Sequence, residues 1–145
     1  MARKRMIDPA FWDSLCMGRC CRESRLLFLG LVSLADDEGR LLADPMWLKS
    51  RLFPFDQDIN AGDLADMLDE LVRADEDDPC IWRYEMDGKP YIQLPKWSDY
   101  QKPSHPQPSK LPICPPDQVP KGHRLPEDFH EAVSDTKKSK KKGSS

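Results

Sequence analysis

The sequence has no long apolar run and no export signal. Its 145 residues are 39% hydrophobic and 32% charged, with a mean hydropathy of −0.69. No stretch approaches the roughly 18 consecutive apolar residues that are typical of a membrane-spanning helix. The basic opening Arg3-Lys4-Arg5 is not followed by the apolar segment of an export signal. A membrane protein and an exported protein are therefore not expected, and the length is that of about one domain.

Paired cysteine motifs and catalytic signatures are also missing. The five cysteines, Cys16, Cys20, Cys21, Cys80 and Cys114, are odd in number and irregularly spaced, which favours reduced thiols in a cytoplasm over a disulfide framework. None of them forms the CxxC pair of a structural zinc site. There is no nucleophile elbow, no glycine-rich phosphate loop and no HExxH motif. We therefore expect no metal site, no cofactor and no enzymatic activity.

Charge is distributed unevenly along the chain. Residues 36–87 contain sixteen Asp and Glu but only five Lys and Arg, a net charge of −11, whereas residues 1–35 carry +3 and residues 88–145 carry +5. An acidic middle between two basic ends is not the profile of a uniformly basic nucleic-acid binder. Any contact with phosphate is therefore expected mostly from the flanks.

Proline is sparse in the first part of the chain and dense in the last. Ten of the fourteen prolines lie between Pro90 and Pro126. Because proline lacks an amide donor and fixes φ, residues 99–116 should form an extended, polyproline-II-like arm. Residues 117–145 are polar and rich in lysine near their end, which favours a disordered tail. The folded domain is therefore expected within residues 1–98.

Helix signals recur in the first half of the chain. Asp8-Pro9 and Asp44-Pro45 each place a capping residue before a proline, which predicts a helix start. The apolar stretch from Glu23 to Ala35 predicts a central core helix. The clearest helix runs from Asn60 to Ala74. Its apolar residues recur at i, i+3, i+4, i+7 and i+8, namely Leu64, Met67, Leu68, Leu71 and Val72.

Strand signals surround one tight turn. Residues 40–42 can form only a short strand, and the β-rich runs 80–86 and 89–95 flank Asp87-Gly88, a strong hairpin signal. With a two-residue turn, Tyr84 lies opposite Tyr91, and both share a face of the hairpin with Trp82. The opposite face, with Ile81, Ile92 and Leu94, should meet the helical core.

The order of these elements predicts the fold class. Helix, short strand, helix, helix, strand, turn and strand is the order of a winged helix-turn-helix. The expected fold is mainly α with a small β-hairpin (α+β), followed by the Pro-rich C-terminal arm. In such folds the second helix of the helix-turn-helix enters the major groove, which here is the helix over residues 60–74.

Five fragments, in this order, carry a resemblance to a known family. They are Arg5-Met6-Ile7-Asp8-Pro9, Leu34-Ala35-Asp36-Asp37-Glu38-Gly39-Arg40, Leu52-Phe53-Pro54-Phe55-Asp56, Tyr84-Glu85-Met86-Asp87-Gly88-Lys89-Pro90-Tyr91-Ile92-Gln93-Leu94, and Gln101-Lys102-Pro103 with Pro108-Ser109-Lys110-Leu111-Pro112. Over roughly residues 3–112 the chain resembles the N-terminal winged-helix domain of phage replication proteins, which is similar to the DnaD-type replisome organisers. The resemblance implies a phage or prophage protein in the cytoplasm of a bacterial host cell. It implies binding to double-stranded DNA, recruitment of replication proteins, and assembly into a dimer or higher oligomer.

Candidate DNA contacts follow from the expected recognition helix, the helix before it and the hairpin. They are mainly cations, with one amide and one aromatic side chain: Lys49, Arg51, Asn60, Arg73, Arg83, Lys89, Tyr91 and Lys96. Basic residues interleaved with aromatic ones suit backbone contact combined with base stacking. The basic ends of the chain either add sequence-independent affinity or are simply solvated.

A second interpretation is a protein-interaction module that docks on another DNA-acting protein, such as a recombinase or a replication component. The outward face of the helix over residues 60–74 is acidic and offers one basic residue, Arg73, so it would repel phosphate. That face either binds a basic partner or is merely solvated. The aromatic hairpin face either docks on a partner or packs under the Pro-rich arm through Trp97 and Tyr100. The candidate partner-binding residues are Asp63, Asp66, Glu70, Trp82 and Tyr84.

Overall fold

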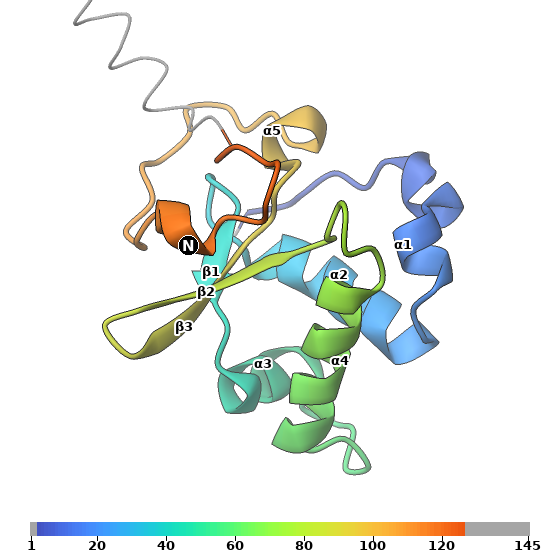
Figure 1. Cartoon of the computed structure of the whole chain (residues 1–145). Helices are drawn as coiled ribbons and strands as arrows, with labels where there is room; N and C mark the ends of the chain where they lie inside the picture. Colours follow the sequence, from blue (N-terminus) through green and yellow to red (C-terminus); the bar gives the residue numbers. More distant parts are fainter. Residues whose placement is uncertain (1–2, 127–145) are drawn as a thin grey trace, which may run out of the picture.

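The computed structural model describes residues 3–126, which form a mixed α+β fold (Figure 1). Within this part of the chain, five α-helices surround a small three-stranded antiparallel sheet. In chain order the elements are η1 (Pro9–Asp13), α1 (Leu15–Gly18), α2 (Arg22–Leu34), β1 (Arg40–Leu42), α3 (Pro45–Leu52), α4 (Ala61–Arg73), β2 (Trp82–Met86), β3 (Lys89–Gln93), α5 (Trp97–Tyr100) and η2 (Pro116–Gln118), where η denotes a 3₁₀ helix.

The sheet confirms the predicted hairpin and adds a third strand to it. The strand order is β1-β3-β2, and Tyr84 pairs with Tyr91 as expected. Asp87 and Gly88 have φ values of 53° and 77°. Positive φ at both turn residues is the conformation that matches the twist of a tight hairpin. On the other side of β3, Leu41 of β1 lies opposite Ile92.

Capping hydrogen bonds form at two of the predicted helix starts, whereas Asp44 occupies the N-cap position of α3 without a side-chain hydrogen bond. The Asp8 carboxylate accepts a hydrogen bond from the Ala10 N–H at 2.8 Å, at the start of η1. At the start of α4, Asn60 and Asp63 form a reciprocal capping box, with both hydrogen bonds at 2.9 Å. Such a box satisfies two amide donors that the first helical turn leaves unpaired. The longest described helices, α2 and α4, have 13 residues each. None of the described helices could therefore span a bilayer.

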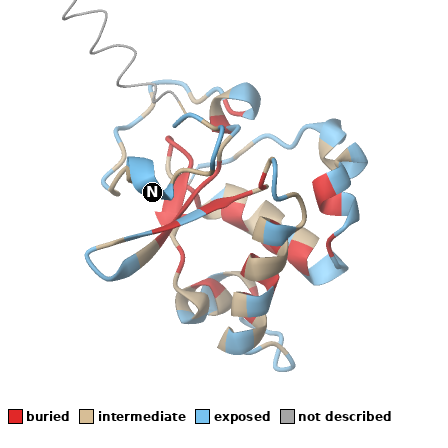
Figure 2. Ribbon diagram, in the orientation of Figure 1, coloured by how far each residue is buried: buried red, intermediate tan, exposed pale blue. Residues whose placement is uncertain are grey.

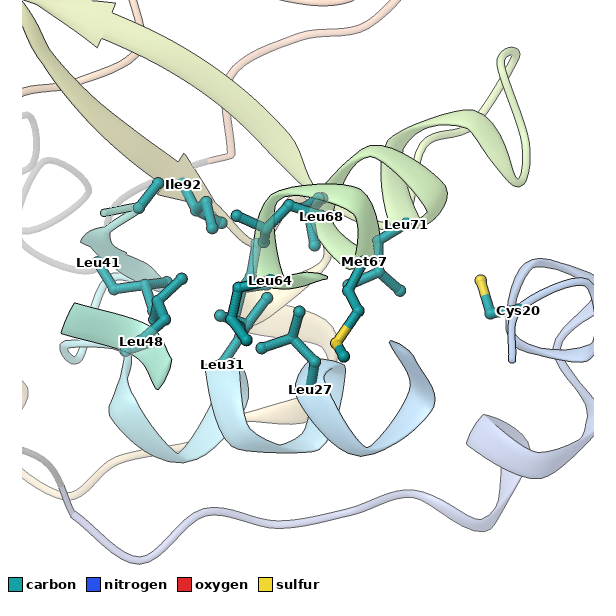
Figure 3. Packing of buried hydrophobic residues seen from close by; sticks show 14 of the residues in the cluster. Cys20, Leu27, Leu31, Leu41, Leu48, Leu64, Met67, Leu68, Leu71 and Ile92 are labelled. Atoms are coloured by element: carbon teal, nitrogen blue, oxygen red, sulfur yellow. The ribbon is translucent and has the colours of Figure 1, made fainter. Parts of the chain in front are cut away.

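The main core lies where α4 packs against α2 and α3. Figure 3 shows Leu64 and Met67 of α4 pointing toward Leu27 and Leu31 of α2, and all of these side chains are buried. The inner hairpin face closes the core, since Ile81, Ile92 and Leu94 belong to the same buried cluster. α2 is less completely buried than its composition suggests, because Leu26 is 58% exposed.

The structure joins Cys16 of α1 and Cys80, two residues before β2, in a disulfide bond. The expectation of five reduced thiols is wrong for this pair. α1 packs beside the chain that enters β2, which brings the two Cα atoms to 6.5 Å although 64 residues separate them in the sequence. α1 and α5 span only four residues each, too few for a hydrophobic period to predict them.

The Pro-rich arm lies on the sheet and continues to Pro126, beyond the expected boundary at residue 116. It contains η2, and the backbone of Glu85 exchanges two hydrogen bonds with the Gln118 side chain, at 2.8 and 2.9 Å. The remainder of the expected tail, residues 127–145, lies outside the described residues.

Candidate functional site

Two of the expected phosphate contacts are engaged in ion pairs. The Arg83 guanidinium on β2 is bonded to the Asp69 carboxylate of α4. The Lys96 ammonium lies 2.7 Å from the Asp78 carboxylate, and this hydrogen bond raises the pKa of Lys96 above its ordinary value. A DNA phosphate at either cation would have to compete with a carboxylate that is already in place.

Three other expected contacts carry no such partner. Lys49 and Arg51 lie in the last turn of α3, and Lys89 follows the hairpin turn. Within residues 3–126, none of the three forms a salt bridge. The Ala43 N–H donates to the Pro90 carbonyl at 3.0 Å, which brings the chain entering α3 beside the start of β3. In Figure 1, α3 lies below the sheet and the hairpin tip extends to the left of it.

The polar face of α4 is largely used by the fold itself. Asn60 and Asp63 form the capping box, and Asp69 holds Arg83. Glu70 accepts a hydrogen bond from the backbone N–H of Cys21 at 2.5 Å, which fastens α4 to the start of α2. Two of the residues expected to contact DNA or a partner, Asp66 and Arg73, remain exposed on this face.

The aromatic face of the hairpin is covered by the arm. Trp82, Tyr84 and Tyr91 are buried at 3%, 4% and 8% exposure, and Figure 2 shows buried residues along the strands together with an exposed hairpin tip. On β2 the buried residues alternate with the exposed Arg83 and Glu85. The two tyrosine rings stack at 5.6 Å and share a small core with Cys114 of the arm. The Tyr84 hydroxyl donates to the Pro112 carbonyl at 2.6 Å. Burial raises the pKa of Tyr84 above its ordinary value.

Two interpretations of this aromatic face were open, and the structure shows the one in which it packs under the arm. The residues that cover it differ from those expected. The covering side chains are Leu111, Cys114 and Val119, with the His123 ring edge-on to Trp82 at 5.9 Å. Trp97 instead belongs to the main core, and Tyr100 is exposed. Trp82, Tyr84 and Tyr91 are not available for base stacking or partner docking while the arm is in place.

The arm is fastened near the turn after α2, at the buried carboxylate of Asp37. This carboxylate lies 3.0 Å from the Arg5 guanidinium and 3.4 Å from that of Arg3, and it accepts the Gln107 N–H at 2.9 Å. Burial by itself would raise the pKa of Asp37, but the Gln107 N–H and the two guanidinium groups outweigh it and hold the pKa below its usual value. The Arg5 guanidinium also lies over the Trp97 ring, 4.9 Å from its centre.

Two further contacts bind the same three segments together. The Gln101 side chain exchanges hydrogen bonds of 2.9 and 2.7 Å with the backbone of Met6. The Ser109 hydroxyl donates to Asp36 at 2.5 Å. Segments around residues 5, 36 and 101–109 thus meet at one place, where they hold the arm.

An apolar groove of about 350 Å³ opens on another side of the molecule. Its walls are η1, α1, α2, the loop over residues 75–80 and the segment from Leu94 to Gln101, and the disulfide-bonded Cys16 and Cys80 both line it. Its rim exposes large apolar side chains, with Met6 at 54%, Ile7 at 55%, Leu15 at 74% and Tyr100 at 42%. Contiguous exposed apolar surface of this kind marks a binding site in many proteins.

Sequence reasoning missed this groove. Met6, Ile7 and Leu15 lie in short segments without a helical or strand period, so no periodic pattern groups them on one surface. The available signal was that these large apolar residues lie outside every predicted core element.

The described residues show no metal centre, since no three His, Cys, Asp or Glu side chains between residues 3 and 126 are grouped as ligands. A comparison of the chain with protein-family models, curated proteins and solved structures finds no match in any of the three.

Proposed function

We propose that this protein is a winged helix-turn-helix protein that holds duplex DNA during phage replication. The element order α2-β1-α3-α4-β2-β3 and the strand order β1-β3-β2 support this fold. In such an arrangement α3 and α4 form the helix-turn-helix and the β2–β3 hairpin is the wing. The phage assignment rests on the resemblance of the sequence fragments, several of which meet where the arm is fastened.

The observation that carries the proposal is the placement of cations without carboxylate partners. Lys49, Arg51 and Lys89 are free of salt bridges within the described chain and lie on α3 and the hairpin turn. Contacts from these positions go to phosphate, which orients a protein on DNA without reading its sequence. The exposed Asp66 opposes deep entry of α4 into the groove. The protein therefore positions itself on duplex DNA through backbone contacts. Recruitment of partners there, as a dimer or higher oligomer, is proposed from the family resemblance alone.

A salt titration of DNA binding tests this surface. Each phosphate contact that is lost reduces the slope of log K against log salt by about 0.9. The triple variant Lys49→Ala, Arg51→Ala, Lys89→Ala should therefore show a shallower slope than the unmodified protein and weaker binding to all sequences alike. Fluorescence anisotropy with two duplexes of unrelated sequence measures both quantities in the full-length chain.

A variant matched in charge serves as the control. Lys110→Ala, Lys121→Ala, Arg124→Ala removes three exposed cations from the arm and should leave the slope nearly unchanged. Equal slopes for the two triple variants would refute the α3–hairpin surface.

Asp66→Lys separately tests the orientation of α4, since it should strengthen DNA binding only if that helix faces phosphate. Asp66 is the better position for this test than Glu70, because Glu70 holds Cys21.

A further inference from the structure

We propose that the apolar groove between α1, α2 and α5 binds a short segment of a partner protein that carries apolar side chains flanked by Lys or Arg. The groove is separate from the proposed DNA surface, because α1 and the hairpin tip lie on opposite sides of the molecule (Figure 1). The test of this inference therefore does not depend on whether the protein binds DNA.

The exposed rim of the groove indicates a ligand that extends beyond the cavity itself. The cavity of about 350 Å³ has room for a few apolar side chains. The exposed rim extends beyond it and includes Ile7, Leu15 and Tyr100. Burying the floor and the rim together requires an extended or helical segment rather than a compact ligand.

The charges around the groove select a basic ligand. Among its lining residues are three carboxylates, Asp8, Asp75 and Asp78, against the single cation Lys96. Lys96 is already paired with Asp78. Asp8 and Asp75 therefore line the groove with no lining cation to balance them. Cations on the ligand are attracted to this rim, which complements them in charge.

The same charges disfavour other occupants. A fatty acid or an acidic phospholipid would bring its anionic head group to the carboxylates of the rim, and the phosphates of a nucleic acid would be repelled in the same way. The chemistry expected of the ligand is thus an apolar centre with positive ends. A second copy of this chain is the remaining alternative occupant of the groove, and the sedimentation experiment below distinguishes it from a basic peptide.

A selection from displayed random short peptides on the full-length protein tests the proposal. The selection is counter-screened on Ile7→Glu, Leu15→Glu, which changes two exposed rim residues without disturbing the core. Enriched peptides should carry an apolar centre with Lys or Arg at the ends. Measured by anisotropy as synthetic peptides, they should bind this double variant about tenfold or more weakly. Met46→Glu, Phe55→Glu is the matched control, since these side chains are 72% and 94% exposed outside the groove, and it should retain full binding.

The charge component is tested with Asp8→Asn, Asp75→Asn. Asparagine keeps the side-chain oxygen that accepts the local backbone N–H groups of Ala10, Asp77 and Asp78. This variant should weaken binding of the basic peptides about threefold to tenfold and reduce its salt dependence. Failure to enrich any peptide, enrichment of acidic peptides, or equal binding to the rim variant would overturn the proposal. A concentration-dependent dimer in sedimentation that Ile7→Glu, Leu15→Glu abolishes would assign the groove to a second copy instead.

Discussion

The Asp37 carboxylate accepts a hydrogen bond from the backbone N–H of Gln107 at 2.9 Å, although 70 residues separate the two in the sequence. The same carboxylate is paired with Arg5, whose side chain is only 4% exposed. One buried acid thus holds both the N-terminal segment and the Pro-rich arm against the turn that follows α2. The arm covers the aromatic face of the sheet, so this contact is one of those that keep that face covered.

Replacing Asp37 with Asn should destabilise the protein markedly. The amide oxygen can still accept the Gln107 N–H, but the buried Arg5 guanidinium loses its counter-charge. Breaking a buried ion pair from one side costs about 3 kcal/mol or more. Urea denaturation of Asp37→Asn should show this loss in the free energy of unfolding, and Asp58→Asn, at an exposed acid, should change it by less than about 0.5 kcal/mol. A similar small change for both variants would contradict the role of Asp37.

The contribution of Asp37 should also disappear in acid. Because its pKa in the folded protein lies below the ordinary value of 3.8, folding favours the ionised form. The stabilisation is then fully present above the unfolded pKa and is lost as the pH falls toward the folded pKa. The difference in unfolding free energy between the unmodified protein and Asp37→Asn should be constant between about pH 5 and 7 and should shrink below about pH 4. A difference that grows on acidification would have the wrong sign for this carboxylate.

Local signals in the sequence predicted most of the helices and the hairpin. The spacing of Leu64, Met67, Leu68 and Leu71 defined α4, since one buried helix face imposes this period. Asp87-Gly88 defined the hairpin and its register, because few residues other than glycine and Asn or Asp readily adopt positive φ. These features depend on residues close in the sequence, so they can be read without knowing the tertiary structure.

The contacts that decide the candidate sites are long-range and left no such signal. The pairing of Arg83 with Asp69, the covering of Tyr84 by Pro112 and the Cys16–Cys80 bond each depend on how separate elements pack. A proline-rich composition predicts an extended chain but not the surface on which it lies. For this reason the sequence left open whether the hairpin aromatics are exposed or packed, it predicted Arg83 and Lys96 as phosphate contacts although both are paired with carboxylates, and it did not predict the groove.

The cysteines should fall into three classes of reactivity. Cys21 is exposed, Cys20 and Cys114 are buried, and Cys16 and Cys80 are bonded to each other. Burial, together with the Glu70 charge, raises the pKa of Cys20 to about 11, and burial also raises the pKa of Cys114. Since the thiolate is the reactive form, a chromogenic disulfide reagent at pH 8 should titrate one thiol quickly and two slowly in the native protein.

Denaturation separates the buried thiols from the bonded ones. Without reductant, the denatured chain should titrate three thiols, and after reduction it should titrate five. Cys21→Ser should remove the fast phase alone. Five reactive thiols in denaturant without any reductant would show that Cys16 and Cys80 are not bonded in the purified protein.

Two glycines with nearly the same backbone conformation should respond very differently to alanine. Gly39 has a φ of +78° and Gly122 a φ of +83°, so alanine at either position costs about 1–2 kcal/mol in backbone strain. At Gly122 a Cβ would meet no atom within 4 Å, whereas at Gly39 it would lie 2.7 Å from Cγ of Trp97. Trp97 cannot move aside freely, because it is buried and its indole N–H donates to the Asp37 carbonyl at 2.8 Å. Overpacking of this kind adds about 1–3 kcal/mol. The free energy of unfolding should therefore fall clearly further in Gly39→Ala than in Gly122→Ala, and equal losses would mean that the turn after α2 is not packed against Trp97.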